Sequence, residues 1–254
     1  MTSKNAIKGV ESPRLSQDPP VCSISSPVPE SSAQEIDPSP AEDQNDASEK
    51  LAADGSIFDC FTPGTHIKTI RGEVLVERLR VDDRVLTRDN GFQSVRWIGF
   101  RRLSRMELST LPQLNPIEIS PGALGRGLPE RKMRVSPQHR MLIEGRGAQM
   151  YFGRDEVLVA AAHLTCLPGI RRVEPEEVTY VHILFDRHEI VLGDGAWSES
   201  FQPADNSLAG LDGDAREEIL TLFPEFEEPG VAAVAYPAAR MTIQAKEAPL
   251  LFMQ

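Results

Sequence analysis

Short runs of alternating apolar and polar residues, separated by turn signals, fill the middle of the chain. Gly, Asn and Asp lie between these runs, as at residues 71–72, 89–91 and 193–195. No long amphipathic helical pattern interrupts them, so we expect an all-β domain. The pattern predicts strands at residues 66–70, 74–79, 84–87, 94–98, 133–135, 140–143, 156–160, 178–185, 189–192 and 196–201.

Two later segments depart from this pattern. Residues 101–131 are rich in Pro and Gly and are predicted to form a long ordered loop. Residues 215–223 are predicted to form one short helix, with Ile219 and Phe223 on one face and Asp212 or Asp214 near the N-terminus.

The first part of the chain has a different composition. Residues 1–53 contain seven prolines and ten serines, no aromatic residue, and only eight Ile, Leu or Val residues. Such a segment buries too little apolar surface to offset an ordering entropy of about 1–2 kcal/mol per residue. We therefore expect a disordered arm at 1–53, a folded domain at 54–203, and a C-terminal extension at 204–254 that packs back on the β-core.

Charge separates the same three parts. Residues 1–53 hold 4 basic and 9 acidic residues, residues 54–203 hold 20 of each, and residues 204–254 hold 3 and 9, for a formal charge of −11. Without clustered Lys and Arg, we expect no nucleic acid and no anionic membrane as partner. The sequence lacks a long apolar span and an apolar signal core, which predicts a cytoplasmic protein or one secreted by a non-classical route. It gives no information on oligomers.

Three cysteines are too few for a disulfide framework. His163 and Cys166 have H-x-x-C spacing, which together with Cys60 is one pattern of a zinc site. No second ligand pair accompanies them, so a packed loop is the favoured interpretation. We expect no metal and no cofactor, and we expect no role for Cys22.

Three blocks carry a resemblance to a known family. The segment DCFTPGTHIKTIRG at 59–72, followed by VERLRVDDRVLTRDNGFQSVRWIG, resembles the opening of the Hint (hedgehog and intein) family, with Asp82 where a glycine is usual. The block VSPQHRML supplies Ser136 and His139, and YVHILFDRHEIVLGDGAWSESF supplies His182 and His188. The resemblance covers about residues 56–203. It implies a horseshoe-like β fold and a self-processing activity.

In such a domain the Cys60 sulfur attacks the carbonyl of Asp59 and replaces the peptide bond with a thioester. The amide resists attack because resonance stabilises it, as its ~18–20 kcal/mol rotation barrier shows. A thiol of pKa ~8.5 is only about 3% thiolate at neutral pH, so a nearby base or positive dipole would help. His139 is our candidate to protonate the leaving nitrogen.

Other residues of the blocks have supporting roles in this hypothesis. Ser136 is expected to hydrogen-bond the scissile amide and hold it away from its relaxed geometry. Gly64 and Thr65 are expected to form the tight turn after the nucleophile and to offer N–H donors to the oxyanion. The resemblance gives His182 the role of a polar residue that couples two steps, although its strand position also suits the core.

The remaining candidates have ordinary structural interpretations. His188 is expected to hydrogen-bond locally and His66 to lie exposed on a strand. Trp97 and Trp197 are expected in the core.

The residues at the end of the domain determine how the thioester is resolved. Splicing inteins end in His-Asn followed by Cys, Ser or Thr, whereas the matching segment here is SESFQP, residues 198–203, and no His precedes Asn206. We therefore expect N-terminal cleavage without splicing, in which water or an external thiol or amine releases residues 1–59. The chain's own N-terminal segment is then the substrate.

Two alternatives stay open. The first is an inactive Hint-fold protein that works as a binding or regulatory module. The second is a Cys-His hydrolase that acts on another molecule, for which the sequence supplies no substrate pocket.

Overall fold

Strands dominate the part of the chain that the computed structural model describes, residues 59–203, 208, 211, 213–228 and 230–253. The largest sheet has the order β14-β9-β8-β13-β12-β1-β3-β4, and β2 pairs with β1 at its side. All its pairings are antiparallel except β14 with β9. Its strands are β1 (His66–Thr69), β2 (Gly72–Leu75), β3 (Arg84–Thr87), β4 (Gly91–Ser94), β8 (Arg140–Glu144), β9 (Glu156–Ala160), β12 (Ile190–Gly193), β13 (Ala196–Glu199) and β14 (Thr242–Ile243).

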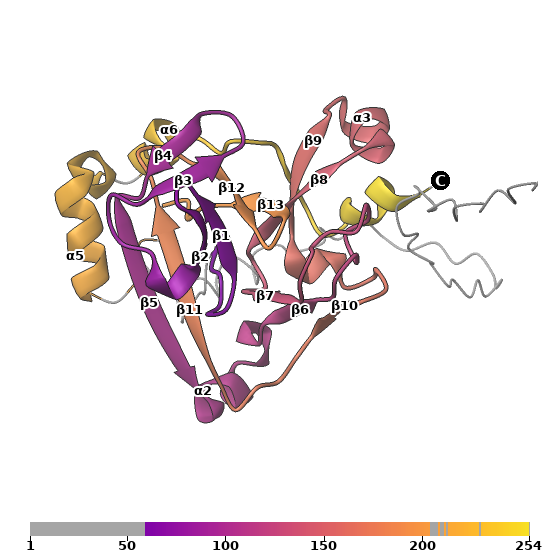
Figure 1. Ribbon diagram of the computed structural model, residues 1–254, viewed down its shortest axis with the longest axis horizontal. Helices are drawn as coiled ribbons and strands as arrows, with labels where there is room; N and C mark the ends of the chain where they lie inside the picture. Colours follow the sequence, from indigo (N-terminus) through magenta and orange to yellow (C-terminus); the bar gives the residue numbers. More distant parts are fainter. Residues whose placement is uncertain (1–58, 204–207, 209–210, 212, 229, 254) are drawn as a thin grey trace, which may run out of the picture.

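Two smaller antiparallel sheets complete the β structure. One has the order β10-β6-β7, from β6 (Ile117–Ile119), β7 (Met133–Val135) and β10 (Ile170–Arg172). The other is a long ladder of β5 (Trp97–Ser104) and β11 (Glu177–Leu184). Figure 1 shows this ladder on one side of the molecule, and β8 and β9 on the other. The all-β prediction is confirmed.

The predicted strands at 84–87, 133–135 and 156–160 have the observed bounds. Two others need correction. The predicted strand at 94–98 is wrong, because β4 ends and β5 begins within it. The second half of the predicted strand 74–79 is a 3₁₀ helix, Val76–Arg78.

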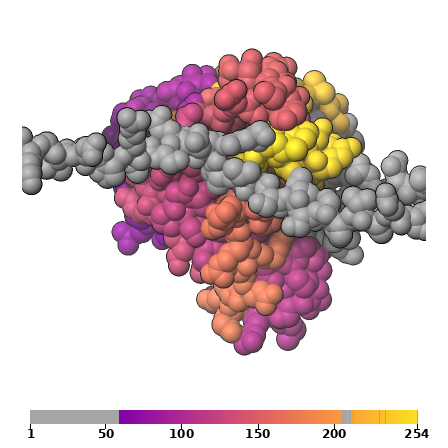
Figure 2. Space-filling view, turned by 90° about the vertical axis from the view of Figure 1, so that its right-hand side faces the viewer, coloured from indigo at the N-terminus to yellow at the C-terminus, as the bar shows by residue number. Residues whose placement is uncertain are grey.

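The predicted loop at 101–131 is also wrong in its first half. Strand β5 continues to Ser104, which caps helix α2 (Arg105–Thr110). The cap is a capping box, in which the Ser104 side chain accepts from the N–H of Glu107 and the Glu107 side chain accepts from the N–H of Ser104. A 3₁₀ helix (Pro112–Leu114) and strand β6 come next in the chain. In Figure 2 the magenta α2 region and the orange turn before β11 form a lobe at the lower end of the molecule.

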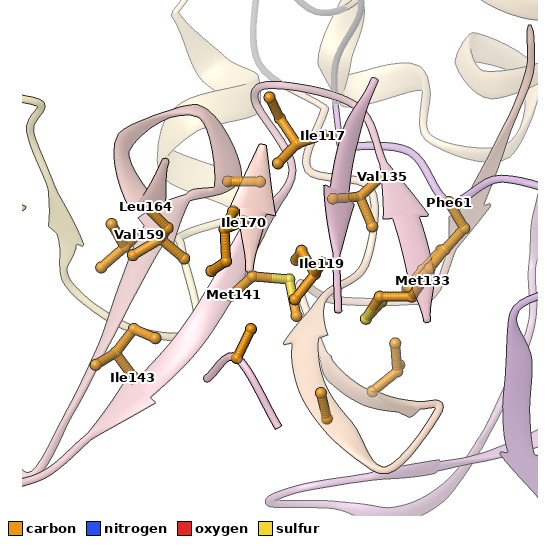
Figure 3. Close-up of a cluster of buried hydrophobic side chains, with 14 of the residues drawn as sticks. Phe61, Ile117, Ile119, Met133, Val135, Met141, Ile143, Val159, Leu164 and Ile170 are labelled. Carbon is orange, nitrogen blue, oxygen red and sulfur yellow. The ribbon is translucent and has the colours of Figure 1, made fainter. Parts of the chain in front are cut away.

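The main hydrophobic core lies between these sheets. Alternate residues of β6, β7, β8 and β9 and the side chain of Phe61 interdigitate there, as Figure 3 shows. Helix α3 (Arg146–Phe152) and the 3₁₀ helix Ala161–Leu164 close its edges. Phe61 thereby anchors the start of the described chain in the core, one residue after Cys60.

The C-terminal extension packs on the β domain. Helix α5 (Gly213–Leu222), the 3₁₀ helix Pro224–Glu227 and α6 (Val231–Ala235) bury a second cluster against Trp97, Leu184 and Phe201. The chain then adds β14 to β9 and ends in the 3₁₀ helix Ala248–Phe252 beside α3. The expectation of one helix is therefore incomplete, because the described part of the extension contains both α5 and α6.

The disordered arm expected at 1–53 lies outside the described residues. Among the residues that are described, no helix is long and apolar enough to cross a membrane.

Because Ile219 of α5 is fully buried in the second cluster, we expect Ile219→Ala to lower the free energy of unfolding by about 2–5 kcal/mol. Val234 of α6 is 81% exposed, so Val234→Ala should change it by less than about 0.5 kcal/mol. Urea unfolding measures both values. An equal, small effect of the two substitutions would show that the extension is not part of the folded core.

Candidate active site

The position of Cys60 follows from how its neighbour Phe61 pairs. Phe61 forms antiparallel bridges with Val135 at the end of β7 and with Val181 of β11. In an antiparallel pair, a step forward on one strand is a step back on the other. The residue before Phe61 is therefore opposite Ser136 on one side and His182 on the other, and Cys60 lies between them.

Ser136 holds the backbone of Cys60 by two hydrogen bonds. The N–H of Cys60, which is the nitrogen of the Asp59–Cys60 peptide bond, donates to Ser136 Oγ at 3.1 Å. The N–H of Ser136 donates to the Cys60 carbonyl at 3.0 Å. The structure therefore places Ser136 on the amide to which its expected role assigns it.

His182 lies against the sulfur. Cys60 Sγ is 3.2 Å from His182 Nδ1 and 3.4 Å from Nε2, so either nitrogen is close enough to take the thiol proton. His182 is opposite Gly99 in the β5–β11 ladder. A Cβ at Gly99 would lie 2.1 Å from the Trp97 ring, so glycine there leaves room for the indole beside His182, with ring centroids 6.2 Å apart.

His139 comes after Ser136 in a tight turn, with its N–H donating to the Ser136 carbonyl at 3.2 Å. Its ring packs edge-on against Phe61, with centroids 4.5 Å apart. The side chain is fully buried, and neither ring nitrogen has a hydrogen-bond partner among the described residues. Burial, with the nearby Arg140, lowers the pKa of His139 from 6.5 to about 3, so the imidazole is neutral at neutral pH.

The thiol of Cys60 is neutral in this structure. Cys60 is 0% exposed. Burial raises the pKa of its thiol well above the usual value, and the neighbouring Asp59 carboxyl raises it further. Attack by this sulfur therefore needs a base in contact with it, and His182 is in that position.

A buried charged cluster at Asp59 was missed by the sequence analysis. Asp59 is 4% exposed, and the Glu199 side chain, which is 0% exposed, lies close enough to raise the pKa of the Asp59 carboxyl. Arg140 donates to Glu199 from its backbone N–H at 2.7 Å and from Nη1 at 2.8 Å. The cluster forms because Met141 of β8 pairs with Ser198 of β13, which puts Arg140 opposite Glu199.

The two hydrogen bonds from Arg140 favour the carboxylate form of Glu199. Burial raises the pKa of Asp59 well above its usual value, and the Glu199 carboxyl adds to the rise. Burial also raises the pKa of Glu199, but Arg140 opposes that rise. Asp59 is therefore the carboxyl of this pair whose neutral form the site favours.

His188 completes the cluster. The N–H of Ala239 donates to His188 Nδ1 at 2.9 Å, which places the proton of the neutral ring on Nε2. Nε2 lies 3.3 Å from Glu199 Oε2, in close contact but without hydrogen-bond alignment. Burial lowers the pKa of His188 to about 4. His188 was expected to hydrogen-bond locally, but this hydrogen bond comes from Ala239 of the C-terminal extension.

The turn after the nucleophile forms at the expected residues. Gly64 has φ +95°, in the left-handed region that favours glycine. Its N–H donates to Glu77 Oε2 at 3.0 Å, and the N–H of Thr65 donates to the Thr62 carbonyl at 3.3 Å. Both donors are occupied within the turn, so neither supports the expected role as an oxyanion donor.

A surface hollow of about 220 Å³ lies beside this turn, lined by Thr62, Pro63, Gly64, Thr65, Lys132, Met133 and Arg134. Cys60, His139 and His182 do not line it. The reacting atoms are therefore enclosed by protein rather than exposed in this hollow.

Other candidates lie outside the site. Asp82 has φ +70°, which explains why a glycine is usual there. His66 is half-buried and lies 3.1 Å from Asp194, so it is not the exposed residue we expected. Trp97 is buried as expected, but Trp197 is only half-buried, with Arg88 over its ring.

The zinc pattern does not form a cluster. Cys166 Sγ lies 3.9 Å from the His163 carbonyl rather than against its ring. Among the described residues, no three His, Cys, Asp or Glu side chains gather in a way that could hold a metal ion.

Comparison with known proteins identifies the family. The family model described as the Hint domain matches residues 59–205, more than half of the chain. The protein belongs to the Hint domain family, and the resemblance noted in the sequence is confirmed.

Solved structures that are similar to this chain include inteins. The bacterial intein-like domain from Clostridium thermocellum is 12% identical, with a TM-score of 0.37 over 57% of this chain and 100% of that one. The gp41-1 intein is 11% identical, with a TM-score of 0.33 over 55% and 96%. A DnaB intein from Synechocystis sp. is 11% identical, with a TM-score of 0.34 over 56% and 98%. The comparison with curated proteins finds no match.

The lowered pKa of His139 predicts a pH-dependent contribution to stability. Below pH 6.5 the His139 imidazole of the unfolded chain takes up a proton, whereas that of the folded chain stays neutral down to about pH 3. The contribution of His139 to the free energy of unfolding is therefore complete above pH 6.5. It decreases as pH falls toward 3, by up to about 1.4 kcal/mol per pH unit. Asp59 and Glu199 act in the opposite sense, because their raised pKa values make the folded state hold extra protons.

The test is accordingly a difference between two proteins. Urea unfolding from pH 7 to pH 4 should show that wild type loses free energy of unfolding relative to His139→Leu as pH falls. Parallel pH profiles would show that His139 titrates normally in the folded state.

Proposed function

We propose that this Hint domain cleaves its own chain once, at the Asp59–Cys60 bond, through a thioester at Cys60. The observation that carries the proposal is the position of Cys60, whose amide N–H is bonded to Ser136 and whose sulfur contacts His182. The substrate is the segment that precedes Cys60.

His182 is the proposed base. As the sulfur attacks the Asp59 carbonyl carbon, His182 takes the thiol proton and then delivers it to the Cys60 nitrogen, which leaves as an amine. The C–S bond forms, the C–N bond breaks, and one proton moves from sulfur to nitrogen. Both atoms belong to Cys60, so a single imidazole in contact with the sulfur can serve both transfers.

His139 has a different role from the general acid expected from sequence. With a pKa of about 3, it is too seldom protonated at neutral pH to act as that acid. Its neutral ring still carries one N–H, which has no partner among the described residues in the resting state. A hydrogen bond from such a donor becomes strongest when negative charge develops nearby. We therefore assign this N–H to the oxyanion of the tetrahedral intermediate.

The outcome is cleavage without splicing. The segment at 198–203 contains no Asn to cyclise, and Ser198, Glu199 and Ser200 are fully buried. The thioester is then resolved by hydrolysis or by an external thiol or amine, and residues 1–59 are released.

Intact-mass measurement of the full chain tests this function. We expect wild type to yield fragments that end at Asp59 and begin at Cys60, faster with hydroxylamine or dithiothreitol. Cys60→Ala should abolish cleavage, and His182→Ala should slow it by about 10²–10⁴-fold because the base is lost. Ser136→Ala should slow it less, by about 10-fold, because one hydrogen bond to the scissile amide is removed.

His66→Gln is the matched control, since it replaces a histidine outside the site and should cleave at the wild-type rate. A wild-type chain that stays intact after long incubation with hydroxylamine would contradict the proposal. It would support the alternative of an inactive binding or regulatory module.

A further inference from the structure

The residue on the acyl side of the scissile bond is itself a buried acid. The Asp59 carboxyl is enclosed with Glu199, Arg140 and His188, and Cys60 is its chain neighbour. Burying a carboxyl is costly unless it is hydrogen-bonded. The fold therefore provides a specific environment for this side chain, immediately beside the carbonyl under attack.

The surroundings of the acyl carbon limit which nucleophile can resolve a thioester. Cys60, Ser136 and His139 are fully buried, and none of them lines the hollow beside the turn. An external amine or thiol has to enter this enclosed site, whereas the Asp59 carboxyl is already inside it.

We propose that the Asp59 carboxyl resolves the thioester from within, by attacking its own acyl carbon with Glu199 as the base. The inference rests on the thioester of the proposed function. It extends that function by naming the nucleophile and the residue that activates it.

The covalent structure of aspartate favours this attack. One carboxyl oxygen, Cγ, Cβ, Cα and the acyl carbon close a five-membered cyclic anhydride. Intramolecular attack in a well-oriented system has an effective molarity of about 10⁵–10⁸ M, far above any free nucleophile.

Bonds and protons balance in this step. The Asp59 oxygen bonds to the acyl carbon while its proton passes to the Glu199 carboxylate. The C–S bond breaks, and the Cys60 sulfur leaves with the electron pair and takes a proton from water. A water molecule then opens the anhydride, which gives the released arm two ordinary carboxyl groups at Asp59, and Glu199 returns its proton to solvent.

The contacts of Glu199 suit it to this role. Its carboxyl lies beside that of Asp59 in the buried cluster and raises the pKa of Asp59, so a proton can pass between the two side chains. Arg140 holds it in the carboxylate form through two hydrogen bonds. Burial raises the pKa of Asp59 well above its usual value, so its carboxyl is neutral before that transfer.

Cleavage of the full-length chain in H₂¹⁸O tests the pathway. Direct hydrolysis of the thioester puts ¹⁸O only in the α-carboxyl of Asp59. Opening of an anhydride puts part of the label in the side-chain carboxyl, because water can attack either carbonyl. Fragmentation of the tryptic peptide 51–59 locates the label, and Asp54 in the same peptide is the internal control. Label confined to the α-carboxyl would overturn the inference.

Variants give a second, independent test. Asp59→Ala should slow spontaneous release at least about 100-fold, because the internal nucleophile is lost, while hydroxylamine still releases the arm through the thioester. Asp59→Glu can close only a six-membered anhydride, so its rate of spontaneous release should lie between those of wild type and Asp59→Ala. Asp54→Ala is the matched control and should match wild type.

The outcomes separate the two proposals. Spontaneous release from Asp59→Ala at the wild-type rate would overturn the internal nucleophile and leave the thioester intact. Release that survives Cys60→Ala would overturn the thioester and this inference together.

Discussion

The pairing of Phe61 between two strands is the constraint on which the site depends. Its N–H and C=O exchange hydrogen bonds of 3.0 and 2.9 Å with Val181, and its ring is buried in the main core. Side chains alternate along a strand, so a slip of one residue would turn Cys60 away from His182 and Ser136. The core therefore fixes the pairing of Phe61, and that pairing determines which side chains face Cys60. The same register brings the sulfur of Cys60 against the His182 ring.

Burial then determines the protonation state of each reacting group. The thiol of Cys60, the imidazole of His139 and the carboxyl of Asp59 are all held neutral, because the charged form of each loses its hydration. Glu199 differs because Arg140 compensates its charge. In such a site, protons move between partners in contact rather than through water. The contacts of Cys60 with His182 and of Asp59 with Glu199 are the two pairs that allow such transfers.

The sequence located the residues that lie in contiguous motifs. Cys60, Ser136 and His139 stand in recognisable blocks, and the structure brings their segments together. It did not locate Glu199 or Arg140, because their pairing depends on the register of β8 with β13, which no local pattern encodes. The role of His182 stayed open for a different reason. Its strand is buried on both faces, so its sequence pattern does not show which side chains face the site. Helix α2 was missed although its signal, Ser104 followed by Glu107, is present in the sequence.

The C-terminal extension is part of the architecture of the site. Its Ala239 N–H fixes the tautomer of His188, which directs Nε2 toward Glu199. Its aromatic cluster packs against Phe201, whose ring lies 5.1 Å from that of His182. Tyr236 adds a hydrogen bond to the Phe185 carbonyl at the end of β11. Both His182, which contacts the sulfur, and Glu199, which lies beside Asp59, are thus supported by contacts from the extension. The β domain and the extension therefore form one folded unit around these residues.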